Sequence, residues 1–202
     1  MKRLSAPPTP PPFGTDAVNV LRYILFAKTP MSAEGNGNGS SYARVILQQC
    51  LSARLMVQPA TESEDAEYVQ IGRGLIVYVC FLKGASETMI DKMVKSVLEA
   101  RLSEPTDGGR LVSILDLPGD VMIIPQATLG GSLKGKVMQY HGNVQKDDGL
   151  RLYTQFVEKC EKTVAIANVK TGQNSIVRYG TYGNRQVFST ETNGPYTHYI
   201  EF

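Results

Sequence analysis

Apolar residues recur along the chain with two different periods. Residues 75–82 are apolar throughout, which is typical of a strand buried on both faces. Residues 86–102 instead carry apolar side chains three and four positions apart, which predicts a helix. Those side chains are Met89, Ile90, Met93, Val94, Val97, Leu98 and Leu102. The same spacing predicts a second helix from residue 147 to about residue 165, with Leu152, Phe156, Val157 and Cys160 on one face.

Runs rich in β-branched and aromatic residues predict the strands. They cover residues 43–57, 67–71, 75–82, 110–115, 121–124, 175–179, 185–191 and 196–202. The Pro-Gly pair in Leu117-Pro118-Gly119-Asp120 fits a type II turn and predicts a hairpin between 110–115 and 121–124. A strand buried on both faces requires at least three layers. The pattern therefore predicts a mixed α/β fold with about eight strands and two main helices.

The first 40 residues differ from the remainder. They combine a proline-rich start at residues 7–12 with a glycine- and asparagine-rich stretch at residues 35–40, which is typical of a flexible extension. Residues 16–28 carry an apolar face and predict a short helix that Pro30 stops. This helix either docks on the domain or is an organelle-targeting remnant, a role that the proline density and Asp16 disfavour. We expect an extension at 1–40 and one domain at 41–202.

Composition narrows the class of protein. The 202 residues are 42% hydrophobic and 20% charged, with a net charge of +2, as in an ordinary globular domain. A nearly neutral chain is not expected to coat long nucleic acids, but it can grip the end of one. No apolar run approaches the ~18 residues of a membrane span. We therefore expect no membrane association.

The cysteines and histidines indicate a cellular compartment and give no sign of a metal site. Cys50, Cys80 and Cys160 each lie in an apolar segment and form no metal or disulfide pattern, so we expect buried thiols in a reducing, cytoplasmic compartment. The only histidines are His141 and His198, and no ligand cluster accompanies them. We expect neither a metal nor another cofactor.

The candidate chemistry begins where a buried strand ends. Pro125-Gln126-Ala127-Thr128-Leu129 follows the apolar residues 121–124 and precedes two glycines. Backbone N–H groups beside Gln126 and Thr128 are candidates for binding a developing oxyanion. Thr128 is the only hydroxyl there; as a nucleophile it needs an adjacent base, and the alternative is a hydrogen bond that holds the loop. Gln126 either orients water or a carbonyl, or is an ordinary surface residue.

A second candidate stretch is Thr192-Asn193-Gly194-Pro195-Tyr196-Thr197-His198. The carbonyls of Gly194-Pro195 can point outward, because glycine tolerates unusual dihedrals and proline donates nothing. An ordinary turn is the alternative, and the sequence leaves the Gly-Pro isomer open. His198 is a candidate acid or base, and a structural role is the alternative. No Gly-x-Ser-x-Gly and no Gly-x-x-x-x-Gly-Lys is present.

Together, these two stretches resemble the signature motifs of the D-aminoacyl-tRNA deacylase family. The resemblance spans residues 43–202 and includes Gly72-Arg73-Gly74-Leu75, residues 152–160 and Tyr179-Gly180-Thr181-Tyr182-Gly183. It implies a homodimer of a β/β/α-layered fold that hydrolyses the ester of mischarged tRNA during translation proofreading. Pro125 and Ala127 stand where the D-selective branch has Ser and a larger residue, and Tyr196 and His198 also depart from that branch. These departures resemble the sister branch called animal-type tRNA deacylase.

The resemblance assigns roles to both stretches. The terminal adenosine of tRNA would lie by residues 125–129, and Gly194-Pro195 would reach into the partner subunit's pocket. The implied catalytic residues are Gln126, Thr128, Gly194 and Pro195. The implied substrate-binding residues are Pro125, Ala127, Leu129, Asn193, Tyr196, Thr197 and His198. Backbone amides and the ribose 2′-hydroxyl would replace a side-chain base.

The branch determines the implied substrate. In the D-selective branch a cis Gly-Pro excludes L-amino acids; in the animal-type branch a trans bond turns the carbonyls away and admits L-alanine mischarged on threonine tRNA. A strictly D-selective deacylase and a non-catalytic module that binds the tRNA 3′ end are the alternatives. Lys134 and Lys136, in a glycine-rich basic segment, are candidate contacts to the acceptor stem, with a solvated loop as the alternative.

Overall fold

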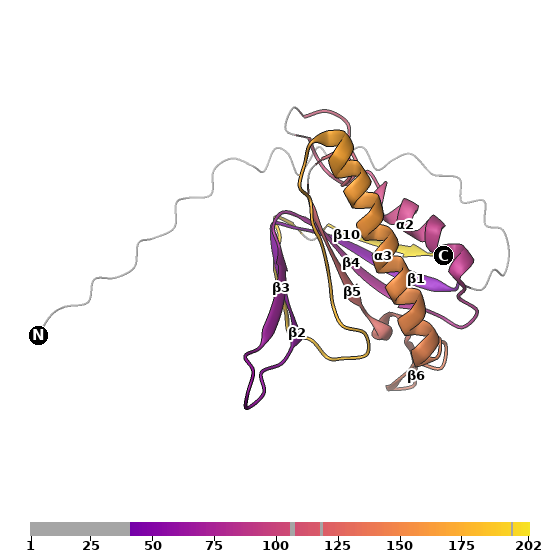
Figure 1. Ribbon diagram of the computed structural model, residues 1–202. Coiled ribbons are helices and arrows are strands. Elements are labelled where there is room, and N and C mark those ends of the chain that lie inside the picture. The colour runs from indigo at the N-terminus through magenta and orange to yellow at the C-terminus, as the bar shows by residue number, and fades with distance from the viewer. Residues whose placement is uncertain (1–40, 106–107, 118, 195) are drawn as a thin grey trace, which may run out of the picture. The chain divides into compact units, whose positions relative to one another are not determined.

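The structure is a computed structural model that describes residues 41–105, 108–117, 119–194 and 196–202. The expected N-terminal extension with its short helix lies outside the described residues, and so does Pro195. The described part contains ten strands, two α-helices and two short 3-10 helices (Figure 1). The strands are β1 (Ala43–Cys50), β2 (Ser52–Gln58), β3 (Glu67–Ile71), β4 (Gly74–Phe81), β5 (Asp120–Pro125), β6 (Ser132–Lys134), β7 (Val137–Gln139), β8 (Val177–Tyr179), β9 (Phe188–Glu191) and β10 (Thr197–Glu201). The helices are η1 (Glu87–Met89), α2 (Ile90–Leu98), η2 (Ala127–Gly130) and α3 (Lys146–Thr171).

Most of the described strands form two sheets. The larger, sheet A, has the order β10-β1-β4-β5-β8, and the smaller, sheet B, has the order β3-β2-β9. β5 runs parallel to β4 and β8, whereas the other pairs in both sheets are antiparallel. β6 and β7 form a separate two-stranded hairpin. The central position of β4 and β5 in sheet A matches their apolar composition.

Three layers enclose two cores. Figure 1 shows α2 and α3 on one face of sheet A and sheet B on the other. Leu75, Val77 and Val79 of β4 belong to the core under the helices, while Ile76 belongs to the core between the sheets. The alternation follows from the strand period of two. The predicted mixed α/β fold with at least three layers is confirmed, although the described strands exceed the predicted eight.

Both predicted helices are present with shifted ends. The first begins as η1 and continues as α2, which ends at Leu98, four residues before the predicted end. The second continues past residue 165 to Thr171, where Gly172 caps it with a φ of +70°. Left-handed backbone is available to glycine at little cost and commonly ends helices. Cys160 is buried on the inner face of α3, as expected, and Cys50 and Cys80 are also buried free thiols.

Two strand predictions were wrong. The single strand expected over residues 43–57 is broken at Leu51, so that β1 belongs to sheet A and β2 to sheet B. The hairpin expected between residues 110–115 and 121–124 does not form, because the first segment makes only an isolated bridge between Ser103 and Val112. β5 pairs instead with β4 and β8. The Asp120 carboxylate accepts hydrogen bonds from the Gly72 and Ile176 N–H groups at 2.9 and 3.0 Å, which anchors β5 between segments far away in the chain.

Candidate active site

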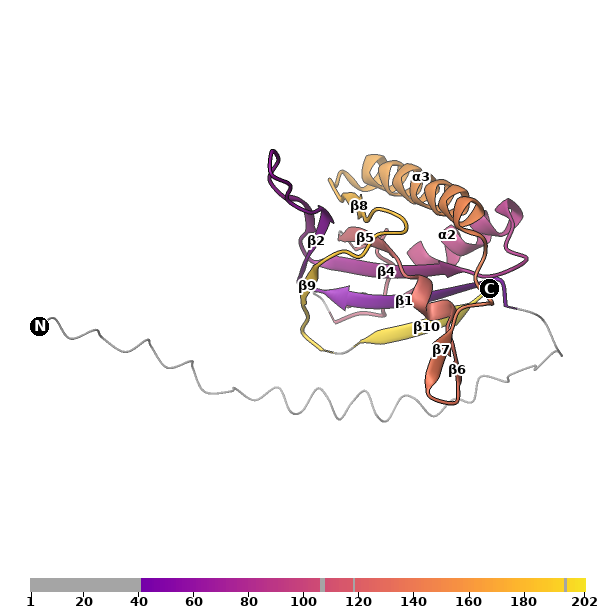
Figure 2. The ribbon, with the colours of Figure 1, turned by 90° about the horizontal axis from the view of Figure 1, so that it is seen from below.

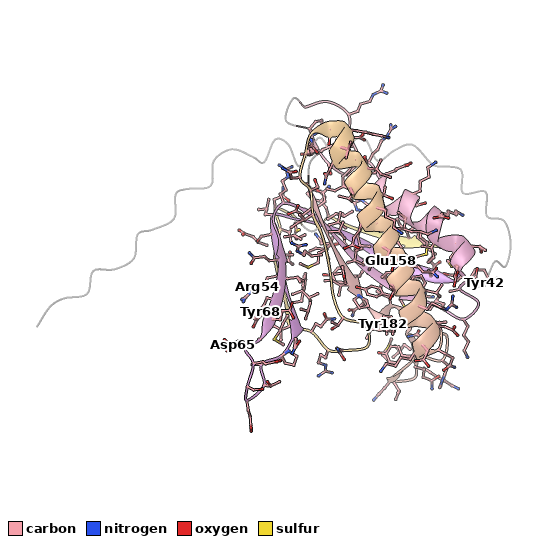
Figure 3. All side chains as sticks on the ribbon, viewed as in Figure 1. Tyr42, Arg54, Asp65, Tyr68, Glu158 and Tyr182 are labelled. Carbon is pink, nitrogen blue, oxygen red and sulfur yellow. The ribbon has the colours of Figure 1, made fainter. Side chains whose placement is uncertain are left out.

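A pocket of about 800 Å³ opens at the end of β5, between sheet A and the segment that leads from β8 to β9. Its floor is apolar and includes Leu55, Tyr78, Ile124 and Phe188. The rings of Tyr78 and Phe188 meet edge to face with centroids 6.0 Å apart. The polar lining side chains are Gln126, Thr128, Asn143, Lys146, Asn184, Arg185 and Gln186. Tyr182 also lines the pocket beside the first turn of α3 (Figure 3). This volume and this lining are typical of a small-molecule site.

The rim beside β5 is formed by η2. The last ladder bond of β5 runs from the Gln126 N–H to the Val79 carbonyl at 2.8 Å, and the chain then turns into a 3-10 helix. The first intrahelical donor of η2 is the Leu129 N–H, which reaches the Gln126 carbonyl. Within the described part of the chain, the N–H groups of Ala127 and Thr128 therefore have no hydrogen-bond partner, as expected for the first donors of a helix. Both residues line the pocket and are exposed.

Side chains from distant segments hold the η2 carbonyls. Asn143 donates from Nδ2 to the Ala127 carbonyl at 2.9 Å, and Arg44 donates from Nη1 to the Leu129 carbonyl at 2.8 Å. Arg44 is also held by Glu201 of β10 at 3.1 Å. In a short helix the peptide groups share one orientation, so holding its carbonyls also fixes the direction of its free N–H groups. These contacts therefore orient the N–H groups of Ala127 and Thr128 at the rim. Neither Arg44 nor Asn143 carried a signal in the sequence, since their partners lie 85 and 16 residues away.

Gly130 lets Asn143 approach the loop. A Cβ at Gly130 would lie 1.8 Å from Asn143 Oδ1 and 3.0 Å from Leu82 Cδ2. Asn143 Oδ1 is buried and, among the described residues, has no hydrogen-bond partner. The glycine pair at residues 130 and 131 was the sequence signal for this tight packing.

Thr128 and Gln126 interact with each other rather than with a base. Gln126 donates from Nε2 to Thr128 Oγ1 at 2.6 Å. Of the described pocket-lining residues, none is Asp, Glu or His. Cys80 also lines the pocket, but burial raises the pKa of its thiol, and its Sγ lies 3.7 Å from the Ala127 carbonyl as a weak donor. The pocket thus offers main-chain donors and amide side chains but no activated nucleophile.

The second sequence motif lies away from this pocket. The register places Thr197 opposite Gln48, and Gly74 lies between Cys50 and Asp120, so β10 begins toward the sheet end where β4 and β5 also begin. Asn193 lines a small cavity with Arg73 and Gly74 at that end. β5 spans roughly 17 Å from there to the pocket, at about 3.3 Å per residue. Within one chain the two motifs are therefore separated along the sheet.

Gly194 is held by its own turn. Its carbonyl accepts hydrogen bonds from Thr192 Oγ1 at 2.6 Å and from the Tyr196 N–H at 2.9 Å, and its N–H donates to Thr192 Oγ1 at 3.1 Å. Tyr196, Thr197 and His198 are exposed. Both lone-pair directions of the Gly194 carbonyl are consequently used within the turn.

The structure divides the predicted site residues into three groups. Pro125, Gln126, Ala127 and Thr128 line the pocket, whereas Leu129 contributes only its carbonyl to the loop contacts. Asn193, Gly194, Tyr196, Thr197 and His198 lie outside it, and Pro195 is not among the described residues. Lys134 ends β6 and Lys136 follows in the turn of the exposed β6–β7 hairpin (Figure 2). Lys146 and Arg185, which the sequence did not single out, do line the pocket.

Within residues 41–105, 108–117, 119–194 and 196–202, no three His, Cys, Asp or Glu side chains gather closely enough to hold a metal ion. In the same described part of the chain, neither α2 nor α3 is long and apolar enough to cross a membrane.

The fold and the pocket define a three-layered β/β/α domain with two free main-chain donors beside a pocket of about 800 Å³ that has an apolar floor. Residues 46–201 match the family model described as D-Tyr-tRNA(Tyr) deacylase. The chain belongs to the D-aminoacyl-tRNA deacylase family, as the two motifs predicted.

Individual relatives place the chain within the family. It is 55% identical over 167 residues to D-aminoacyl-tRNA deacylase 2 of Homo sapiens, covering 82% of this chain and 98% of the relative. It is 52% identical over 160 residues to the Danio rerio protein of the same name, covering 79% and 99%. Identity falls to 28% over 160 residues, or 78% of this chain and 96% of the relative, for the D-aminoacyl-tRNA deacylase of Clostridium tetani. The chain therefore lies in the animal-type branch.

Solved structures agree with this fold. A structure described as a probable eukaryotic D-amino acid tRNA deacylase matches 79% of this chain and 99% of its own, with a TM-score of 0.67 and 29% identity. A structure of the c-Myc DNA Unwinding Element Binding Protein matches with a TM-score of 0.65 and 21% identity, covering 79% and 98%, and shows the fold alone.

Proposed function

We propose that the protein is an aminoacyl-tRNA deacylase that hydrolyses the ester of mischarged tRNA in translation proofreading. The observation that carries the proposal is the pair of free N–H groups at Ala127 and Thr128 on the rim of an apolar pocket, in a chain of this family. The relatives' names state that they act on D-aminoacyl-tRNA. We extend the substrates to L-alanyl-tRNA for threonine because of the branch and the Gly194 geometry.

The proposed reaction is attack by water on the ester carbonyl carbon. The carbonyl oxygen gains negative charge and accepts hydrogen bonds from the Ala127 and Thr128 N–H groups, a main-chain oxyanion site. Collapse of the intermediate breaks the carbon–oxygen bond to the ribose, and the ribose oxygen takes a proton, releasing free amino acid and tRNA. Because no carboxylate or imidazole is among the described lining residues, we assign the proton transfer to the neighbouring 2′-hydroxyl of the substrate.

We further propose that the site is completed in a homodimer. Two observations support this: the Gly194 motif is separated from the pocket of its own chain, and β10 has only β1 as a partner among the described strands. An edge strand that carries the exposed Tyr199, with the exposed Tyr196 just before it, is suited to pairing with a second copy. The assembly would bring Gly194-Pro195 of each subunit to the pocket of its partner. Each dimer would then have two sites, and both subunits would contribute to each site.

The Gly194 turn supports relaxed chirality. The Gly194 carbonyl already accepts hydrogen bonds from Thr192 and Tyr196 of its own chain. It therefore has little capacity to accept a further hydrogen bond from the amino group of the substrate. A strictly D-selective enzyme is expected to present such an acceptor. The remaining partner assignments stay proposals: the acceptor end of tRNA, with Lys134 and Lys136 as contacts, and a cytoplasmic location that fits three buried free thiols.

Two substrates measured side by side test the function. Wild-type protein is expected to hydrolyse L-alanyl-tRNA for threonine and also D-tyrosyl-tRNA. The main-chain donors bind the ester carbonyl oxygen, and this contact does not depend on the configuration at the Cα atom of the amino acid. Release of labelled amino acid measures both rates. Cleavage of the D-ester alone would contradict the assigned chirality, and tRNA binding without cleavage of either ester would favour a non-catalytic module.

Thr128→Ala is expected to retain activity within about tenfold of wild type. The substitution removes a hydroxyl that accepts from Gln126 Nε2 but leaves the Thr128 N–H in place, and the loss of one neutral hydrogen bond costs about 1 kcal/mol. Steady-state kinetics on aminoacyl-tRNA measure the change. Complete loss of turnover with an unchanged melting temperature would instead identify Thr128 as a nucleophile.

A further inference from the structure

Two cations stand at the mouth of the pocket. Lys146 and Arg185 are the only charged side chains among its described lining residues, and both are exposed. Neither takes part in any of the four ion pairs that the described residues form. A pocket with an apolar floor, whose charged lining side chains are both cationic, favours a ligand that is uncharged where it is buried and anionic where it leaves.

The Lys146 ammonium lies against the segment that carries Arg185. Gly183 has a φ of +84°, and a Cβ at this position would lie 3.0 Å from Lys146 Cε and 3.5 Å from Lys146 Nζ. The lysine chain therefore crosses the backbone of Gly183, two residues before Arg185. Lys146 is also the first residue of α3, followed in the same turn by Asp147 and Asp148, neither of which lines the pocket.

The segment that carries Arg185 is held in place. Gln186 Oε1 accepts from the Thr181 N–H at 2.9 Å, and Gln186 Nε2 donates to the Thr181 carbonyl at 3.0 Å. Asn184 Nδ2 donates to Thr181 Oγ1 at 3.2 Å. This network fixes the backbone on both sides of Arg185, so its guanidinium is presented from a constrained loop rather than from a free end.

We propose that Lys146 and Arg185 bind the phosphodiester that precedes the terminal adenosine of tRNA, an assignment that rests on the proposed function. If the ester lies at the Ala127 and Thr128 amides, the nucleoside fills the pocket, and its 5′ oxygen must carry a phosphate out past the rim. Guanidinium and ammonium groups are the side chains that bind phosphate most readily. The pair thus recognises the RNA end by charge, with no dependence on the amino acid attached to it.

The test compares two charge-matched double variants of the full chain. Lys146→Gln/Arg185→Gln removes the pair, and Lys162→Gln/Lys170→Gln removes two exposed lysines of α3 that do not line the pocket. Lys162 lies 16 residues from Lys146, or about 24 Å along the helix. Fluorescence anisotropy measures the binding of a non-acylated RNA minihelix with a CCA end at several salt concentrations.

The first variant is expected to raise Kd about tenfold and to reduce the slope of log affinity against log salt by about 0.7, the value for one single-strand phosphate contact. The control variant is expected to stay within twofold. In kinetics, the first variant is expected to raise KM for aminoacyl-tRNA, with a smaller effect on aminoacyl-adenosine, which lacks the phosphate. An equal effect on both substrates would overturn the phosphate assignment.

The outcomes separate this inference from the proposed function. RNA binding that is insensitive to Lys146→Gln/Arg185→Gln would overturn the inference while leaving hydrolysis by the wild-type protein intact. Wild-type protein that binds the minihelix through these two residues but hydrolyses neither aminoacyl-tRNA nor aminoacyl-adenosine would contradict the proposed function and support the phosphate site.

Discussion

Gly130→Ala is expected to reduce kcat for deacylation by at least about 100-fold without unfolding the protein. The new Cβ would lie 1.8 Å from Asn143 Oδ1, so Asn143 must move, and with it the Nδ2 group that holds the Ala127 carbonyl. Release of this carbonyl lets η2 rotate and misdirects the Ala127 and Thr128 N–H groups. Removal of one oxyanion donor typically costs 10²–10³ in rate, which sets the expected size.

Gly142→Ala is the matched control for this substitution. It lies next to Asn143, its φ is not in the left-handed region, and a Cβ there would meet only the Gly130 carbonyl, at 3.8 Å. We expect rates within twofold of wild type. Asn143→Ala alone should also be impaired, and Gly130→Ala/Asn143→Ala should lose no more than the worse single variant, because both act through one contact. Additive losses would contradict the role of Asn143, and near-normal Gly130→Ala kinetics would contradict the oxyanion site.

Gly194→Ala is expected to reduce deacylation by roughly 100-fold while the dimer persists. A Cβ at Gly194 would lie 2.8 Å from Tyr196 Cε2, which disturbs the turn that presents the motif to the partner's pocket. A displacement of about 1 Å in a positioning element can cost 10² in rate. Kinetics on aminoacyl-tRNA and light scattering of the same sample measure activity and assembly together.

A control variant distinguishes an effect of the new methyl group on its own turn from an effect at the partner's pocket. Gly194→Ala/Tyr196→Ala removes the intrachain contact that the new methyl group would strike. If the methyl group acts at the partner's pocket, this double variant stays impaired relative to Tyr196→Ala. Recovery to the level of Tyr196→Ala would confine the effect to the turn, and wild-type rates for Gly194→Ala would remove the motif from the site altogether.

Local sequence patterns were sufficient to predict most helices and strands, but not which strands pair with each other, because the pairing is long-range. The spacing of Met93, Val97 and Leu98 was sufficient for the first helix, and the wholly apolar β4 was sufficient for a buried strand with layers on both faces. The hairpin prediction failed because β5 pairs in parallel with β4, a contact for which the Pro-Gly turn gives no signal. The β6–β7 hairpin was missed because each of its strands has only three residues, too few for a polar–apolar alternation to stand out.

The candidate site was predicted only in part, for a similar reason. The loop at Gln126 and Thr128 was found because a buried strand ends there beside two glycines, and the structure places both residues at a pocket. Arg44 and Asn143 were not found, because each acts through a main-chain carbonyl in a distant segment. Lys146 and Arg185 were also missed, since two isolated cations give no sequence pattern before folding brings their segments together.

If one subunit's Gly194 motif completes the other subunit's pocket, two inactive variants should restore activity when they share a dimer. We would co-express Gly130→Ala and Gly194→Ala chains with different tags and measure deacylation by the mixed dimers. Random assortment makes about half of the dimers mixed, each with one pocket that has an intact loop and receives an intact motif. We predict that activity returns to about a quarter of wild type, because one of the two pockets in each mixed dimer is intact. Activity no higher than that of either variant alone would contradict the shared site.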